Sequence, residues 1–293
     1  MSKQLNKMLK LDLQELKETG FLQQVQPDRF ALRVRVAAGQ LTGENLQAIG
    51  ELAKQYGNGT VHFTSRQAVE VPFIKAQDIP AVKGLLQAHG LQPGILGARV
   101  RTITACQGAA ICKHGNINTA NLAHKLIDAT RDKELPHKFK IGITGCFNNC
   151  LKAEENDLGI KGAIQPNWLE HLCTYCGACA KKCPVAAISV DKQENSLVYQ
   201  LERCINCGKC VKLCPTKAWA GKAGFMVYFG GTFGNRILIG QRLLTIVLSE
   251  EDLLEVVDKA LNFYQSNGEK GERFGYLLER IGVEKLRAAL TYN

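Results

Sequence analysis

The sequence of 293 residues contains no apolar run of 18 residues, although 45% of its residues are hydrophobic. A helix that crosses a bilayer needs about 20 consecutive apolar residues, so the sequence predicts no membrane span. The first 20 residues also lack the apolar stretch of an export signal, which favours a cytoplasmic protein. They instead predict an amphipathic helix with one face made of Leu5, Met8, Leu9, Leu13 and Leu16.

Aromatic residues and runs of like charge are also scarce. Only 7% of the residues are aromatic, and the formal net charge of +10 is spread along the chain without a run of five or six basic residues. A surface that binds nucleic acid usually gathers its basic residues or interleaves them with stacking aromatics. We therefore expect no nucleic-acid partner, because a small anionic substrate or a polyanionic cofactor explains the positive charge as well.

Cysteine is abundant, by contrast, with 12 residues in four spaced groups and none left over. Disulfides are rare in reducing compartments, so regular cysteine spacings in a cytoplasmic protein indicate metal binding. The four groups are therefore the main evidence for function.

Two of the groups share the spacing C-x2-C-x2-C-x3-C-P, at 173–184 and 204–215. This spacing is typical of ferredoxins with two [4Fe–4S] clusters, in which the fourth cysteine of each group binds the other cluster. The first cluster is accordingly assigned to Cys173, Cys176, Cys179 and Cys214. The second is assigned to Cys204, Cys207, Cys210 and Cys183. A pair of zinc sites is the alternative, but zinc commonly uses two C-x2-C pairs about 12 to 20 residues apart.

The other four cysteines form a C-x5-C pair and a C-x3-C pair: Cys106, Cys112, Cys146 and Cys150. Buried apolar thiols are the simpler interpretation of two loose pairs, because free cysteine is among the most buried residue types. In a chain that already has two cluster motifs, however, four further cysteines predict a third cluster. Gly108 and Gly145 would let the backbone approach its inorganic core.

In these two pairs the sequence resembles the sirohaem-containing sulfite and nitrite reductases, and the resemblance covers nearly the whole chain. It implies that the four cysteines bind a [4Fe–4S] cluster and that Cys150 also ligates the sirohaem iron. The chain has one copy of the family's core and a ferredoxin insert, a pattern similar to the sirohaem subunits of dissimilatory and anaerobic-type sulfite reductases. The implied cofactors are one sirohaem and three [4Fe–4S] clusters.

Two more stretches match parts of the family that contact the sirohaem. They are a T-x-R-Q turn, with Thr64, Arg66 and Gln67, and a late GG loop, with Gly230, Gly231 and Arg236. The resemblance implies that the turn contacts sirohaem carboxylates and that the loop lies along the tetrapyrrole. Several relatives have arginine ahead of the turn, where this chain has His62, so that contact is lost or depends on histidine protonation.

Four basic residues match the anion-binding residues of the family: Arg35, Arg101, Lys138 and Lys140. Lysines two apart on a strand usually mark only a solvated face, but this K-F-K stretch stands just ahead of the C-x3-C pair, as in the family. Such lysines would hold the substrate oxygens and supply protons, while the arginines complete an anion cage. Arg33 is interpreted as structural, and His114 and His137 are left out because cysteines fill every cluster position.

The predicted fold class is α+β, with a sirohaem reductase-like core and an inserted two-cluster ferredoxin domain. Residues 1–93 would form the N-terminal helix and a ferredoxin-like half domain on the substrate side. Residues 94–164 and 220–293 would form the sirohaem and cluster domain, and 165–219 the insert. The patterns predict a hairpin over 188–199 and a strand over 139–144. Helices are predicted over 42–56, 117–131, 273–281 and 284–290, and from Ser249 onward.

The predicted activity is the six-electron reduction of sulfite to sulfide, with electrons delivered by a partner protein through the ferredoxin clusters. No nicotinamide or flavin motif is present. The alternatives are nitrite reduction to ammonia at the same site and a non-catalytic electron-transfer subunit. Relatives with a duplicated core place the sirohaem between two halves, so a single-copy chain is expected to share its site within a homodimer or a hetero-oligomer.

Overall fold

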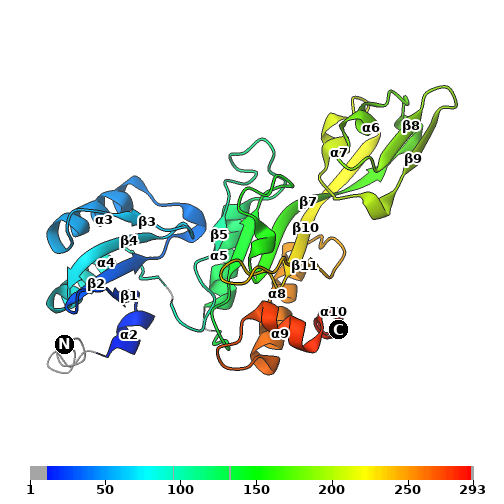
Figure 1. Cartoon of the computed structure of the whole chain (residues 1–293). Helices are drawn as coiled ribbons and strands as arrows, with labels where there is room; N and C mark the ends of the chain where they lie inside the picture. Colours follow the sequence, from blue (N-terminus) through cyan, green and yellow to red (C-terminus); the bar gives the residue numbers. More distant parts are fainter. Residues whose placement is uncertain (1–11, 95, 132, 292–293) are drawn as a thin grey trace.

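The computed structural model describes residues 12–94, 96–131 and 133–291. They form an N-terminal half domain, a central domain and a small domain at the end of a long ribbon (Figure 1). Leu5, Met8 and Leu9 of the expected amphipathic helix lie outside these residues. The helix α2 (Leu13–Glu18) buries Leu16, whereas Leu13 is exposed.

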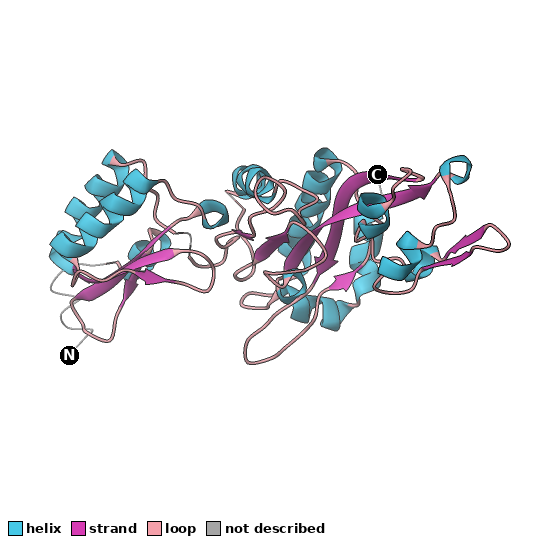
Figure 2. Cartoon of the chain, turned by 90° about the horizontal axis from the view of Figure 1, so that it is seen from above, coloured by secondary structure: helices cyan, strands magenta, loops and turns pink. Residues whose placement is uncertain are grey.

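The half domain is a four-stranded antiparallel sheet in the order β1-β2-β4-β3. Its strands are β1 (Phe21–Gln23), β2 (Arg29–Val34), β3 (His62–Phe63) and β4 (Val69–Lys75). Helices α3 (Gly43–Tyr56) and α4 (Ile79–Ala88) cover one face of this sheet (Figure 2). Helix α3 begins where predicted, because the Thr42 hydroxyl accepts a hydrogen bond from the backbone N–H of Asn45.

The central domain contains a five-stranded mixed sheet in the order β11-β10-β7-β6-β5. These strands are β5 (Thr104–Ala105), β6 (Ile141–Thr144), β7 (Leu158–Trp168), β10 (Trp219–Phe229) and β11 (Gln241–Arg242). Strands β5, β6 and β7 are parallel, so their carboxyl ends lie at one edge of the sheet. That edge carries the cysteines described below.

Four helices of the central domain pack against this sheet: α5 (Thr119–Thr130), α8 (Glu250–Asn267), α9 (Phe274–Ile281) and α10 (Val283–Thr291). The serine at 249 caps α8 as predicted, because its hydroxyl accepts a hydrogen bond from the N–H of Asp252. Phe139, Tyr264 and Phe274 stack in the core with ring centroids 5.2–5.7 Å apart. None of the described helices is both long and apolar enough to span a bilayer.

Strands β7 and β10 form an antiparallel ribbon that extends beyond the rest of the sheet (Figure 1). Eleven residue pairs join them, from Leu158 opposite Phe229 to Trp168 opposite Trp219. The chain between the two tryptophans forms helices α6 (Ala178–Lys182) and α7 (Lys209–Leu213) and the hairpin of β8 (Ile188–Asp191) and β9 (Ser196–Tyr199). The mixed α and β composition and the 188–199 hairpin are therefore confirmed.

Candidate active site and cluster sites

Four cysteines surround a cavity of about 300 Å³ at the carboxyl edge of the parallel strands: Cys106, Cys112, Cys146 and Cys150. Cys106 directly follows β5, and Cys146 comes two residues after β6. Parallel pairing of the two strands therefore brings sequence-distant cysteines together. Burial raises the pKa of the Cys146 thiol, and the neighbouring thiols of Cys106, Cys112 and Cys150 raise it further.

Glycines allow the loops around this cavity to pack closely. Gly108 has φ = +60°, and a Cβ atom on it would lie 2.4 Å from the Thr119 hydroxyl. Gly145 approaches the Cα atom of Gly108, and its N–H donates to the Sγ atom of Cys106 over 3.0 Å. Backbone N–H groups that point at sulfur are suited to hold cysteines that carry negative charge when they ligate metal.

The T-x-R-Q turn joins the half domain to the central sheet. Its first residue, Thr64, closes the turn by accepting a hydrogen bond from the N–H of Ala68. Gln67 lines the cysteine cavity, and its side-chain amide forms two hydrogen bonds with the backbone of Ala105, of 2.9 and 3.0 Å. Gln67 thus fixes the residue that precedes Cys106.

Arg66 points to the opposite end of the strands from Gln67. Its guanidinium donates to the carbonyls of Thr102 and Ile141 over 2.7 and 3.0 Å and to the Asn156 side chain over 3.0 Å. Burial lowers the pKa of Arg66 to about 10. Because both terminal nitrogens are bonded to protein oxygens, the contacts of Arg66 are mainly structural.

The ferredoxin-like cysteines form two groups in the small domain. Cys173, Cys176, Cys179 and Cys214 line one cavity with Trp219, which is buried. Burial raises the pKa of Tyr199, and a hydrogen bond with Cys204 raises it further. Cys210 and Cys183 act on the same pKa through their charges, so the three cysteines lie near this side chain. Burial raises the pKa of Cys210 to about 12, and the charge of Cys207 adds to this shift. The structure therefore brings the four cysteines of each group close to one another.

These surroundings fit iron–sulfur clusters better than single ions. No three His, Cys, Asp or Glu side chains in the described parts of the chain lie close enough to bind one metal ion. Two of the three groups of thiols instead surround cavities. Backbone N–H groups also donate to Cys173, Cys183 and Cys204 over 3.2–3.4 Å.

Lys138 and Lys140 lie on one face of the segment that leads into β6, with the buried Phe139 on the other. Burial lowers the pKa of both lysines, and the charge of Arg273 lowers both further. Arg101 also acts on Lys138, and Arg66 on Lys140. The predicted pair is therefore part of a dense group of cations.

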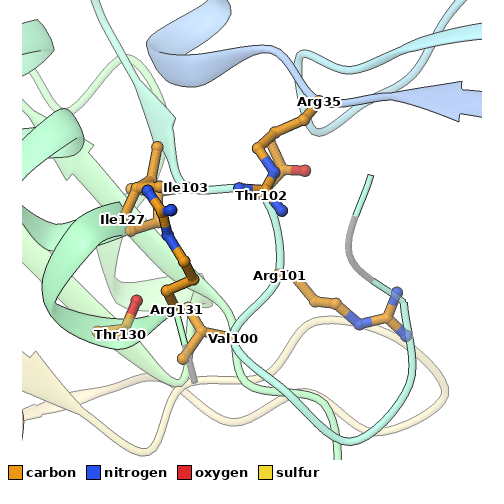
Figure 3. Close-up of a pocket in the computed structure, with 8 residues that line it drawn as sticks. All are labelled: Arg35, Val100, Arg101, Thr102, Ile103, Ile127, Thr130 and Arg131. Atoms are coloured by element: carbon orange, nitrogen blue, oxygen red, sulfur yellow. The ribbon is translucent and has the colours of Figure 1, made fainter. Parts of the chain in front are cut away.

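Arg35 and Arg101 border one small cavity, of about 20 Å³, but they point in different directions. Figure 3 shows the Arg101 guanidinium directed away from Arg35 and Arg131. Burial lowers the pKa of Arg35, and Arg131 is the charged neighbour that lowers it further. The Nε atoms of Arg35 and Arg101 are buried without a partner in the described residues. Arg101 thus belongs with the lysines, whereas Arg35 lies beside Arg131.

Two charged residues near the lysines had not been predicted from the sequence: Asp157 and Arg273. Asp157 is fully buried and accepts hydrogen bonds from the Lys140 backbone N–H and from the Arg273 guanidinium, all of 2.8–3.3 Å. An aspartate directly ahead of an apolar strand was the available sequence signal. Arg273 gave none, since it lies 116 residues from its partner.

The remaining predicted residues lie in the GG loop and in strands β2 and β3. Gly230 donates its N–H to the Asp157 carbonyl, and Gly231 packs against the Glu154 carbonyl so closely that a Cβ atom would lie 2.0 Å from it. Arg236 is exposed and pairs with Glu279 over 2.8 Å. The GG loop therefore packs on the turn that follows the C-x3-C pair. The exposed His62 lies in β3, and Arg33 pairs with Glu70, consistent with a structural role.

Within one chain, the cysteine cavity and the lysines lie at opposite ends of the parallel strands. Lys140 precedes β6, and Cys146 follows it. The four residues of β6 span about 13 Å between them. The same holds for Arg101 and Cys106 on either side of β5.

Comparison with protein families gives two matches. Residues 96–292 match the nitrite and sulphite reductase 4Fe–4S domain, and residues 22–89 match the nitrite/sulfite reductase ferredoxin-like half domain. The first match alone covers more than half of the chain.

Two curated relatives are 33% identical to this chain. The coenzyme F420-dependent sulfite reductase of Methanocaldococcus jannaschii matches over 87% of this chain and 41% of its own length. A subunit of the anaerobic sulfite reductase of Salmonella typhimurium matches over 54% of this chain and 50% of its own length. The chain therefore spans about half the length of these relatives or less.

Solved structures share the fold at low sequence identity. A dissimilatory sulfite reductase I superimposes with a TM-score of 0.72 at 18% identity, over 90% of this chain and 69% of that one. The Mycobacterium tuberculosis NirA protein superimposes with a TM-score of 0.67 at 17% identity, over 96% of this chain and 46% of that one.

Proposed function

The chain belongs to the nitrite and sulphite reductase family, and we propose that it reduces sulfite to sulfide with six electrons. The observation that carries this proposal is the pairing, on one sheet, of a four-cysteine cavity with a group of cations that has too few carboxylates to neutralise it. Such a group suits a small oxyanion beside a polycarboxylate cofactor.

The proposed cofactors are one sirohaem and three [4Fe–4S] clusters. Cys106, Cys112, Cys146 and Cys150 would hold the cluster linked to the sirohaem, and the exposed Cys150 would bridge the two. The small domain would hold the other two clusters. When bound, the sirohaem supplies a ligand position for sulfur and a route for electrons from the adjacent cluster.

The chain's own residues would bind the anion and move protons. Lys138, Lys140 and Arg101 would hold the sulfite oxygens, and the guanidinium keeps its charge throughout turnover. The lysines would donate protons as oxygen leaves as water, and their lowered pKa makes them better acids than ordinary lysines. Arg66 and Gln67 would fix the half domain against the strands rather than contact substrate.

Nitrite reduction to ammonia is the second candidate, because it needs the same residues and the same number of electrons. Relatives named nitrite reductase match the chain at 26–33% identity over 45–67% of its length. The ferredoxin-like insert is the feature that favours sulfite. A non-catalytic electron-transfer subunit would not need buried arginines and lysines without counterions, since such groups cost stability.

The separation of the cysteines from the lysines supports a shared site. A ligand that must touch both groups can do so when the lysine end of one protomer faces the cysteine end of another. We therefore expect a homodimer, or a pair with a homologous subunit, and an electron-donor protein as a further partner.

Turnover of sulfite by the anaerobically purified protein with reduced methyl viologen tests the activity, with nitrite run beside it. We expect faster turnover of sulfite, about 12 iron atoms per chain and one sirohaem. Eight irons without tetrapyrrole absorption would refute the sirohaem assignment, and turnover of nitrite alone would favour the second candidate. A protein that carries every cofactor but reduces neither anion would be an electron-transfer subunit.

A further inference from the structure

The cations around Lys138 and Lys140 do not all have the same role. Five cations influence one another here: Arg66, Arg101, Lys138, Lys140 and Arg273. Among the described residues, Asp157 is the only carboxylate whose charge acts on Lys138, Lys140 or Arg66. Buried or half-buried cations are costly without counter-charge, so this group is complete only when an anion binds.

Arg66 and Arg273 differ in what their guanidinium groups contact. Arg66 uses both terminal nitrogens on protein oxygens. Arg273, whose side chain is 11% exposed, uses its Nε atom and one terminal nitrogen on Asp157. Its other terminal nitrogen has no hydrogen-bond partner in the described part of the chain. A bidentate clamp on one edge of a guanidinium leaves the remaining N–H groups oriented for a second acceptor.

Asp157 also connects this clamp to the lysines. One of its oxygens accepts the backbone N–H of Lys140 over 2.8 Å, and the same oxygen accepts from Arg273 over 2.8 Å. The carboxylate is fully buried, so it cannot exchange these partners for water. It therefore fixes Arg273 relative to the segment that carries both lysines.

We propose that Arg273, positioned by Asp157, is an additional anion-binding residue of this site, and that Arg66 is a structural residue. The ligand is an oxyanion or a carboxylate, supplied either by the substrate or by the tetrapyrrole. This inference deepens the proposed function, because it adds a residue to the same anion site.

The test compares Arg273→Gln and Arg273→Lys with the wild type, and with Arg287→Gln as the matched control. Arg287 is an exposed arginine of α10 that pairs with Glu284. Acylation of Lys138 and Lys140 is followed by peptide mass spectrometry while sulfate is titrated, and the tetrapyrrole content is measured in the same samples. Neither readout needs enzyme turnover.

If Arg273 binds the substrate-sized anion, Arg273→Gln needs about tenfold or more sulfate to protect the lysines, at unchanged tetrapyrrole content. If it binds a tetrapyrrole carboxylate, the tetrapyrrole content falls and protection by sulfate stays the same. Arg273→Lys keeps the charge but loses the bidentate clamp, so its sulfate protection or tetrapyrrole content should lie between those of the wild type and Arg273→Gln. If Arg273→Gln does not fold, Arg273→Lys serves as the test variant. Asp157→Asn should alter the same readout as Arg273→Gln, because it removes the carboxylate charge that holds Arg273 in place.

Wild-type sulfate protection and tetrapyrrole content in both Arg273 variants would overturn the proposal. Arg66→Lys should lower the thermal stability while leaving half-protection by sulfate unchanged, and a weakened sulfate response there would contradict its structural role. If the wild type fails to reduce sulfite but Arg273→Gln weakens the protection of the lysines by sulfate, the proposed activity is refuted and the anion site is still supported.

Discussion

Lys138 and Lys140 combine partial burial with several cationic neighbours. That combination is unfavourable for stability and is typical of functional residues, because a structural surface lysine avoids both. Phe139 lies between them in the sequence, and its buried ring packs against Phe274 and so fixes the segment that carries both lysines.

Lys138→Ala and Lys140→Ala should each retain sirohaem and lose about 10²-fold or more in sulfite turnover, since positioned proton donors contribute on that order. The rate of sulfite reduction with reduced methyl viologen measures the loss of turnover, and the absorption spectrum measures the sirohaem content. Lys54→Ala, which removes an exposed lysine of α3, should leave both unchanged. Normal turnover in both site variants would make these lysines ordinary surface residues.

The cysteines could be grouped from the sequence because their spacing matches known cluster-binding motifs. The loop lengths within each motif fix how the thiols surround a cluster, and that relation is local. The role of Arg66 could not be predicted in this way. Its partners, Thr102, Ile141 and Asn156, lie 36 to 90 residues away, and only the folded chain reveals that both of its terminal nitrogens already donate to protein oxygens.

The helices and hairpins were predictable where capping and periodicity agree. Helices α3 and α8 begin at the predicted cap residues, and β8 and β9 form the predicted hairpin. The long ribbon of β7 and β10 was not predicted. Its pairing joins segments on either side of the small domain, and such long-range register leaves little trace in a local pattern.

Helix α7 also contacts the loop that carries Cys112. The Lys212 ammonium donates to the carbonyls of His114 and Gly115 over 3.3 and 3.4 Å. This contact links the second ferredoxin-like cysteine group to the cysteine cavity of the central domain.

Lys212→Ala should accelerate amide hydrogen exchange in residues 112–116 with little change in the free energy of unfolding, because exposed lysine contacts contribute about 1 kcal/mol or less. Exchange followed by mass spectrometry measures this. Lys209→Ala is the matched control, since Lys209 is exposed on the same helix and makes no hydrogen bond or ion pair within the described residues. Equal exchange in both variants would show that the contact does not hold the loop.

The anion site should make the whole molecule less stable at neutral pH when no anion is bound. Folding lowers the pKa of Lys138 and Lys140 below 10.5, through burial and through Arg273, Arg101 and Arg66, with Asp157 acting in the opposite direction. The native state therefore binds fewer protons than the unfolded chain between the lowered and the ordinary pKa. Across that window stability rises with pH, and below it the charged lysines cost stability.

Lys140→Met should accordingly raise the free energy of unfolding near neutral pH, and the gain should shrink as the pH approaches 10.5. Denaturant unfolding at several pH values measures it. Sulfate should stabilise the wild type more than the variant, because it binds the native cations. A variant less stable than the wild type at neutral pH without anions would contradict this account.

Mixed protomers test the shared site directly. A Lys140→Ala chain paired with a Cys150→Ser chain would contain one site built from two intact halves, so the mixture should regain sulfite turnover. Lys140→Ala mixed with Lys138→Ala is the control, because both lesions lie at the same end of the strands and every shared site remains damaged. If subunit exchange occurs and neither mixture recovers, each chain completes its own site.

The ribbon of β7 and β10 also bears on how this architecture could be altered. Trp168 and Trp219 are directly paired, so the chain leaves the sheet and returns to it at neighbouring positions. A two-residue Asn-Gly turn can connect paired antiparallel strands. We expect a chain with such a turn in place of residues 169–218 to keep every strand of the five-stranded sheet, and a different inserted domain to fit the same junction without a change of register. The paired ends of the ribbon thus form a junction at which one inserted domain can replace another while the five-stranded sheet stays the same.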